Sequence, residues 1–304
     1  MPLAGAAAAA IAVNEAFMFA RRESAIAGRR TVGFSLWSPS CTADWLAEEE
    51  APELMFLPSR LWLIGLGHLG QAYMWGLGLL PYSNPGELTL VLQDVDVVTP
   101  STESTSVLTD QRMVGRKKTR VTADWAEQRG FATVIHERRF AHDFRRNDEE
   151  PAIALCGLDN ALGRRALEQV GLDLVVEAGL GRGYRDFRTM RLHTLPGNRT
   201  AVDIWSSREQ DDAVEWQPAY QTMLDEGVLN QCGVTLLAGK AVGAPFVGCV
   251  AACLALSEIL RLLHGGRLSE LIAVDLQAVE HRIVIPKSRD FGHLNPGFVR
   301  VRRS

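Results

Sequence analysis

The feature that most constrains this chain is a glycine-rich turn between an apolar run and a stretch compatible with a helix. The run LWLIG ends at Gly65, the turn continues through Gly67 and Gly70, and residues 69–80 suit a helix. A second apolar run at residues 88–92 completes a strand–helix–strand unit, and such units join parallel strands. We therefore expect a parallel sheet that presents this turn at the carboxyl end of its first strand.

The glycines match the pattern G-x-G-x-x-G, in which each has its own physical role. Gly65 allows the tight turn, Gly67 lets the backbone approach a phosphate, and Gly70 lets the helix pack on the strand. Asp94 follows the second strand, where it can accept hydrogen bonds from ribose hydroxyls. His68 inside the turn either approaches a ligand or points outward. The pattern predicts a nucleotide site, leaves a dinucleotide and ATP both open, and has a turn without a ligand as its structural alternative.

Helices and strands continue to alternate downstream of this unit. The expected elements are a helix at 117–128, strands at 133–136 and 152–156, a helix at 160–170, and strands at 174–177, 187–195, 271–274 and 281–285. This alternation predicts the α/β class, with a Rossmann-like, mostly parallel sheet covered by helices on both faces.

Composition excludes several classes of protein. The 304 residues are 47% hydrophobic, and 32 Lys+Arg against 36 Asp+Glu give a net charge of −4, which excludes disordered, fibrous and nucleic-acid-seeking chains. Five cysteines without a CxxC pair favour a reducing, cytoplasmic compartment. The Ala-rich residues 1–13 lack the preceding basic residue of an export signal. The apolar residues 242–263 include Glu258 and Arg261, which argue against a bilayer span.

Two further segments shape the expected organisation. Residues 1–57 are expected to form an N-terminal extension, with a helix over 11–26 and a short strand over 31–37. Residues 58–304 are expected to form one nucleotide-binding domain. Within it, residues 196–232 are polar, irregular and partly acidic, which is typical of a functional loop.

Five segments resemble, in order, motifs of the ThiF/MoeB superfamily, the ubiquitin-activating-enzyme-like adenylyltransferases. They are QDVDVVTPS at 93–101 (D-x-D-x-V-x-x-S), GRKK at 115–118 (G-x-x-K), ALCGLDNALGR at 154–164 (C-T-D-N-x-x-x-R), 177–181 with 187–196, and 232–234 with the helix 243–265. The resemblance covers roughly residues 58–286. It implies a divergent ThiF-like member whose parallel sheet is continued by antiparallel strands.

What the resemblance implies is ATP-dependent activation of a carboxylate as an acyl-adenylate, the substrate being the C-terminus of a small protein or peptide. Lys118 matches the cation on the triphosphate, and Asp159 matches the Mg²⁺-binding aspartate. Asp94 would hold the ribose, with Asp96 in the same cofactor-binding motif. From the residues alone, Lys118 equally suits a solvated helix face, and Asp159-Asn160 a helix cap.

The chain departs from the family pattern at the triphosphate. The family continues S-N-x-x-R-Q, whereas residues 101–106 read STESTS. Thr102 still hydrogen-bonds, but Thr105 cannot replace a guanidinium, and losing one such charge costs on the order of hundredfold in rate. Arg112 and Arg116 are the candidate substitutes. An impaired nucleotide-binding module is therefore the second hypothesis, and an NAD(P)-binding oxidoreductase, permitted by the glycine turn, is the third.

Cysteine chemistry and assembly complete the expectations. In some relatives a thiol near the long crossover loop accepts the acyl group, and Cys232 ends that loop here. The structural alternative is a buried small hydrophobe. The family's zinc-binding CxxC pairs are missing, so no zinc is expected. Relatives commonly pair, which predicts a homodimer, although Arg21 and Arg22 lack the family's R-x-x-R-Q setting.

Overall fold

The computed structural model describes residues 1–302 except 41, 48–51, 182, 207–224 and 226–242. The strands in these residues are β1 Phe56–Pro58, β2 Arg60–Ile64, β3 Thr89–Gln93, β4 Ala132–His136, β5 Ile153–Cys156, β6 Leu174–Leu180, β7 Thr189–Leu195, β8 Ser269–Asp275, β9 Ile283–Pro286 and β10 Phe298–Arg300. The α-helices are α1 Pro2–Ala20, α2 His68–Gly78, α3 Pro100–Thr105, α4 Lys118–Glu127, α5 Ala161–Arg165, α6 Gly183–Asp186, α7 Ala201–Trp205 and α10 Pro245–Leu263. Short 3-10 turns are η1 Pro85–Glu87, η2 Gln111–Met113 and η4 Val279–His281.

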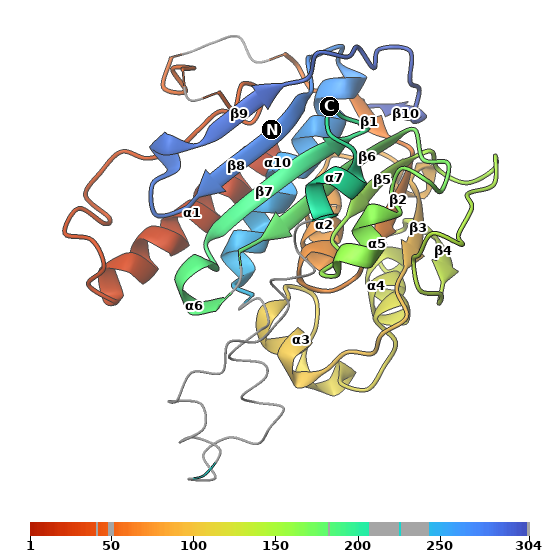
Figure 1. Ribbon diagram of the computed structural model, residues 1–304, viewed down its shortest axis with the longest axis horizontal. Helices are drawn as coiled ribbons and strands as arrows, with labels where there is room; N and C mark the ends of the chain where they lie inside the picture. Colours follow the sequence, from red (N-terminus) through yellow and green to blue (C-terminus); the bar gives the residue numbers. More distant parts are fainter. Residues whose placement is uncertain (41, 48–51, 182, 207–224, 226–242, 303–304) are drawn as a thin grey trace.

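One eight-stranded sheet runs through the molecule in the order β4-β3-β2-β5-β6-β7-β8-β9 (Figure 1). The strands from β4 to β6 are parallel, and β7, β8 and β9 continue the sheet in antiparallel fashion. Helices cover both faces (Figure 1). The predicted α/β fold class, with its mostly parallel sheet and antiparallel continuation, is confirmed.

Alternate residues of the central strand β2 point into two separate cores. Leu61 and Leu63 face a core that includes residues of α1, α2 and α10. Trp62 and Ile64 face a second core, with residues from α7 and the segment after α5. A parallel strand buried on both faces reads as a continuous apolar run, which is why β2 was recognisable in the sequence.

The N-terminal residues differ from their prediction. The helix begins at Pro2 rather than near residue 11, since alanine is the strongest helix former and residues 6–10 are all alanine. The predicted strand over residues 31–37 is wrong. There the Ser35 hydroxyl accepts hydrogen bonds from the backbone N–H groups of Trp37 and Ser38, which turns the chain instead of extending it.

Two described helices, α1 and α10, are long and apolar enough to cross a bilayer by length and composition. Both belong to the core in this structure. α10 is buried along nearly its whole length, and its Glu258 and Arg261 form a buried ion pair. α1 packs against α10 and buries Leu3 and Ile11 in the same core.

Candidate functional site

The glycine turn has the backbone geometry that its pattern predicts. Gly65 has a φ of +82°, a left-handed conformation that favours glycine. A Cβ at Gly70 would lie 2.0 Å from the Gly65 carbonyl oxygen, so the start of α2 approaches β2 more closely than a side chain permits. A Cβ at Gly67 would meet no atom of the described residues within 4 Å. Gly67 is also the N-cap of α2 and provides no side-chain cap, so the backbone there borders open space at a helix N-terminus.

Asp94 joins the carboxyl end of β3 to this turn. Its Oδ2 accepts a hydrogen bond from the Leu66 N–H at 2.7 Å, and its Oδ1 accepts one from the Asp96 N–H at 2.8 Å. Each carboxylate oxygen has a second lone pair. Asp94 thus shapes the turn and still has acceptor capacity for a ribose hydroxyl.

Lys118 lies at the first position of α4 beside Asp96. Its Nζ is 3.1 Å from Asp96 Oδ2, with the lysine side chain 13% exposed and the aspartate 62% exposed. The backbone N–H of Lys118 also donates to the Asp96 carbonyl oxygen at 3.1 Å. Lys118 is therefore a covered, ion-paired cation rather than part of a solvated helix face.

Asp159 lies in the loop that follows β5, beside the glycine turn. β5 pairs with β2 in parallel, and the Gly157 N–H donates to the Ile64 carbonyl oxygen at 2.8 Å. Asn160, not Asp159, caps α5, since its Oδ1 accepts from the Gly163 N–H at 2.7 Å. The Asp159 side chain is exposed, and within the described part of the chain no hydrogen bond or ion pair engages its carboxylate.

The two threonines at the family's asparagine and arginine positions take part in the structure of α3. The Thr102 hydroxyl is buried and completes a capping box with Thr99. The Thr105 hydroxyl donates to the Ser101 carbonyl oxygen at 2.7 Å. Both hydroxyls therefore have local partners, and neither carries the charge of a guanidinium.

The candidate substitute arginines are paired at the surface. Arg112 contacts Asp110 at 2.7 Å, and Arg116 contacts Asp124 at 2.5 Å, with the arginine side chains 89% and 48% exposed. Exposed pairs of this kind contribute little to stability, because solvent screens their charges. Their present partners thus hold these guanidinium groups weakly.

His68 packs between α2 and the start of α10 rather than pointing outward. A Cβ on Gly248 would lie 2.3 Å from His68 Nε2, and one on Gly243 would lie 2.6 Å from Nδ1. Burial lowers the pKa of His68 to about 4, and this effect outweighs a hydrogen bond with the Ala244 backbone, which raises the pKa. The ring is therefore neutral near pH 7 and joins the glycine turn to α10.

The cysteines divide into two groups. Cys232, the hypothetical nucleophile, lies outside the described residues. Cys156, Cys249 and Cys253 are buried, and burial raises their pKa values to about 12, 11 and 12. These three are core residues. Among described residues, three or more His, Cys, Asp or Glu side chains nowhere gather as a metal site.

The sequence analysis assigned no role to a cluster of three ionisable side chains next to the Asp159 loop. It consists of Arg164 in α5, Glu177 in β6 and His193 in β7. Arg164 and Glu177 both fall in the matched motifs, and a charged residue inside an otherwise apolar strand was the available signal for Glu177. The partnership itself spans three elements, so no local pattern reveals it.

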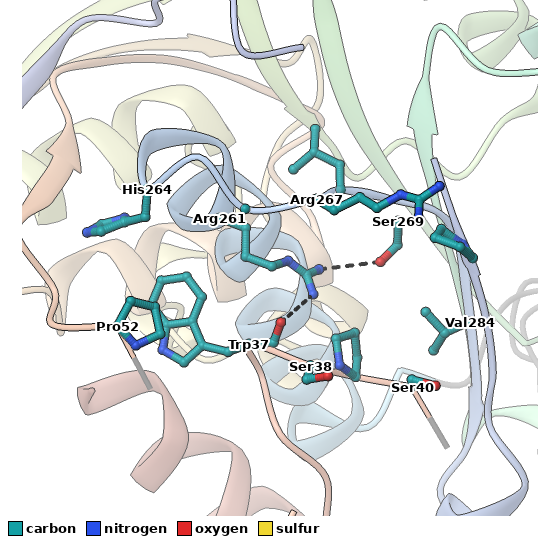
Figure 2. Close-up of a pocket in the computed structure, with 13 residues that line it drawn as sticks. Trp37, Ser38, Ser40, Pro52, Arg261, His264, Arg267, Ser269 and Val284 are labelled. Carbon is teal, nitrogen blue, oxygen red and sulfur yellow. Dashed lines mark hydrogen bonds between the residues drawn. The ribbon is translucent and has the colours of Figure 1, made fainter. Parts of the chain in front are cut away.

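A cavity of about 360 Å³ lies at the opposite end of α10 from His68. Figure 2 shows Arg261 in its wall, donating to the Trp37 carbonyl oxygen at 3.2 Å and contacting the Ser269 hydroxyl at 3.5 Å. A helix of 19 residues is about 28 Å long. This cavity is therefore separate from the glycine turn.

Comparison with known proteins places these features in a family. The BilD C-terminal domain matches residues 57–266, and the BilD N-terminal domain matches residues 1–36. The bacterial E1-like protein BilD of Collimonas sp. (strain OK412) is 52% identical over 276 residues, which cover 90% of this chain and 59% of that protein. The chain thus spans about three fifths of the length of this relative.

Among solved structures, Escherichia coli MccB with ATP is 13% identical, with a TM-score of 0.49 over 77% of this chain and 65% of that chain. Escherichia coli tRNA N6-threonylcarbamoyladenosine dehydratase, TcdA, is 16% identical, with a TM-score of 0.45 over 68% of this chain and 86% of that chain.

Proposed function

Because the chain belongs to the BilD family of E1-like proteins, we propose that it is an ATP-dependent adenylyltransferase that activates a carboxylate as an acyl-adenylate. It is a divergent member of the ThiF/MoeB superfamily. The observation that carries the proposal is the meeting of three parts at the carboxyl edge of the sheet. These are the glycine turn after β2, Asp94 after β3, and the open carboxylate of Asp159 after β5. Ligands of open α/β sheets bind at this edge.

The residues present fit a nucleotide with its metal ion. The open space at Gly67 and the N-terminus of α2 suit a phosphate, and Asp94 has acceptor capacity for the ribose. Lys118 would exchange part of its contact with Asp96 for the triphosphate. Asp159 offers the hard oxygen ligand that Mg²⁺ prefers, and the ion would neutralise charge on the phosphates.

The proposed reaction is an in-line displacement. A carboxylate oxygen of the substrate forms a bond to the α-phosphorus, the bond from that phosphorus to the bridging oxygen of the β-phosphate breaks, and pyrophosphate leaves. The substrate loses no proton, because it attacks as the carboxylate. The chain's own contribution is to orient the nucleotide at the turn and to supply positive charge through Lys118.

The proposal extends to the substrate of the enzyme and to its oligomeric state. We infer that the carboxylate is the C-terminus of a small protein or peptide, which the E1-like character of the BilD relative supports. A homodimer in the cytoplasm and an acyl-accepting role for Cys232 belong to the same proposal.

A catalytically impaired nucleotide-binding module is the second candidate. The observation that favours it is the local engagement of the Thr102 and Thr105 hydroxyls within α3. Arg112 or Arg116 would have to leave its carboxylate partner to supply the missing charge. We set the oxidoreductase alternative aside, because the family is E1-like.

Isothermal titration of the full chain with MgATP and, separately, NAD⁺ tests the proposal. We expect MgATP to bind and Asp159→Ala to weaken that binding at least about tenfold, as loss of a metal ligand or its support does. Asp148→Ala is the matched control, since this fully exposed aspartate precedes β5 at the amino end of the sheet. Binding of NAD⁺ alone, or equal MgATP binding without Asp159, would overturn the proposal.

A further inference from the structure

Three ionisable side chains, those of Arg164, Glu177 and His193, lie next to the Asp159 loop. Arg164 Nη1 and Glu177 Oε1 are 3.1 Å apart, and their side chains are 7% and 0% exposed. The other oxygen of Glu177 is 3.0 Å from His193 Nδ1. A carboxylate only accepts hydrogen bonds, so Nδ1 carries the proton. Burying such a pair is costly and rarely adds net stability, so its presence calls for another explanation.

The guanidinium of Arg164 connects this cluster to the loop. Its Nε donates to the Leu158 carbonyl oxygen at 2.7 Å, and its Nη2 donates to the same oxygen. The ring of Trp205 lies 4.2 Å from the guanidinium carbon and covers it. Two donors of one rigid fork thus hold the carbonyl immediately before Asp159.

The opposite side of the loop is held by β2 and α2. The Tyr73 hydroxyl donates to the Cys156 carbonyl oxygen at 3.1 Å, and the Gly157 N–H donates to Ile64. Gly65 packs so closely on the Gly157 backbone that a Cβ there would lie 3.0 Å from its carbonyl carbon. Residues 156–158 are therefore fixed from both sides, and Asp159 is the first residue beyond them with an exposed side chain.

We propose that Arg164, held by Glu177, is a positioning residue that fixes where the Asp159 carboxylate meets the metal ion of a bound nucleotide. This inference rests on the proposed function. Lysine at this position would keep a charge opposite Glu177 but would lose the fork that grips the Leu158 carbonyl. Residues that orient a metal ligand typically change metal affinity about 10-fold to 100-fold when replaced.

The test compares nucleotide binding with and without the metal. The full chain carrying Arg164→Lys is titrated with ATP in Mg²⁺ and with ATP in EDTA. We expect MgATP affinity to fall about tenfold, with affinity in EDTA changed less than about twofold. Combined with Asp159→Ala, the lysine substitution should cause no further loss, because residues that act through one another are not additive.

The neighbouring arginine provides a matched control. Arg165 lies in the same helix, and its guanidinium donates to the Trp205 carbonyl oxygen at 2.8 Å. Arg165→Lys should leave the effect of Mg²⁺ on ATP affinity unchanged. Glu177→Gln, which keeps the size of the side chain but removes its charge, should weaken MgATP selectively and carries the test if Arg164→Lys does not fold.

Three results would overturn the inference: equal effects of Arg164→Lys and Arg165→Lys, equal loss of ATP affinity with and without Mg²⁺, or further loss in the Asp159→Ala background. Failure of the proposed function is distinct. In that case wild type binds no ATP, or Asp159→Ala binds MgATP like wild type.

Discussion

The glycine turn and α3, which both approach Gly243 through His68 and Thr105, differ in how they meet a nucleotide's needs. At the turn, the requirements are set by the backbone: a left-handed Gly65, close packing at Gly70 and open space at Gly67. At α3, the hydroxyl of Thr102 pairs with the N-cap Thr99 and that of Thr105 with the Ser101 carbonyl oxygen. The chain thus has the backbone scaffold for nucleotide binding but lacks, at α3, the positive charge that the family places on the triphosphate. We therefore expect changes at the turn to affect nucleotide binding and changes at α3 to affect the rate of adenylation.

The largest expected effect breaks the turn itself. In Gly70→Ala the new methyl group meets the Gly65 carbonyl oxygen. Such overpacking should lower the free energy of unfolding by about 3 kcal/mol, and nucleotide binding should be lost with it. Urea unfolding measures the loss. Gly5→Ala in α1, where a Cβ meets nothing within 4 Å, is the control and should be neutral or slightly stabilising. Equal stability of the two variants would contradict the tight packing at Gly70.

His68 belongs to the glycine turn and packs against Gly243 and Gly248, so its titration tests how firmly α10 is joined to the turn. Its folded pKa of about 4 is below its usual value of 6.5, so protonation favours the unfolded state. The stability that the neutral ring provides is present above about pH 6.5 and is lost as the pH falls through 4. Between pH 7 and 5, wild type should lose about 2 kcal/mol more than His68→Gln in urea unfolding. Parallel pH profiles would show that the ring is not buried.

Removing the positive charge of Lys118, at the start of α4, tests which groups contact the triphosphate. Lys118→Met keeps the length of the side chain and should lower ATP affinity about tenfold, with AMP affinity little changed. Titration calorimetry measures both. Lys117→Met is the control, since Lys117 Nζ donates to the Val95 carbonyl oxygen instead. An equal loss for AMP would place Lys118 away from the β- and γ-phosphates.

Restoring the family's charge should have a smaller effect in the opposite direction. Thr105→Arg supplies a guanidinium at the end of α3 and should raise MgATP affinity by up to about tenfold. Thr105→Gln is the control for size without charge. If both variants bind MgATP like wild type, the triphosphate does not approach α3.

The smallest expected effect is the lack of reaction of the buried thiols with an alkylating reagent. It provides the baseline against which a reactive cysteine would be recognised. With pKa values raised by burial to about 11–12, Cys156, Cys249 and Cys253 should remain unmodified by iodoacetamide at pH 8 in the folded protein. Mass spectrometry after brief exposure, with urea-unfolded protein as the control, measures this. Rapid labelling of any of the three without denaturant would contradict their place in the core.

The central sheet was predictable because its information is local. The β2–α2–β3 unit follows from two apolar runs and the glycines between them, and the antiparallel continuation followed from the family resemblance. The pairing of β1 with β10 was not predictable, because Phe56 and Arg300 are 244 residues apart in the sequence. α5 ends at Arg165 rather than near residue 170; Gly163 in its middle weakens the helix.

In the candidate site, too, the parts set by local sequence were predictable and the parts set by tertiary contacts were not. The turn and Asp94 are adjacent to strands whose ends must meet at one edge, so sequence spacing located them. The grip of Arg164 on Leu158 depends on contacts among α5, β6 and the Asp159 loop, which only the tertiary structure brings together. The sequence also offered Asp159-Asn160 as a helix cap in place of a metal ligand, and in the structure the cap of α5 is Asn160.

Hydrogen exchange with and without MgATP tests the central claim most directly, because it locates the nucleotide without requiring a known acyl substrate. We expect slower exchange of backbone amides in residues 65–70 and 157–160, with residues 261–269 beside the cavity at Arg261 (Figure 2) unchanged. Protection confined to residues 261–269, or none at the glycine turn under saturating MgATP, would contradict it.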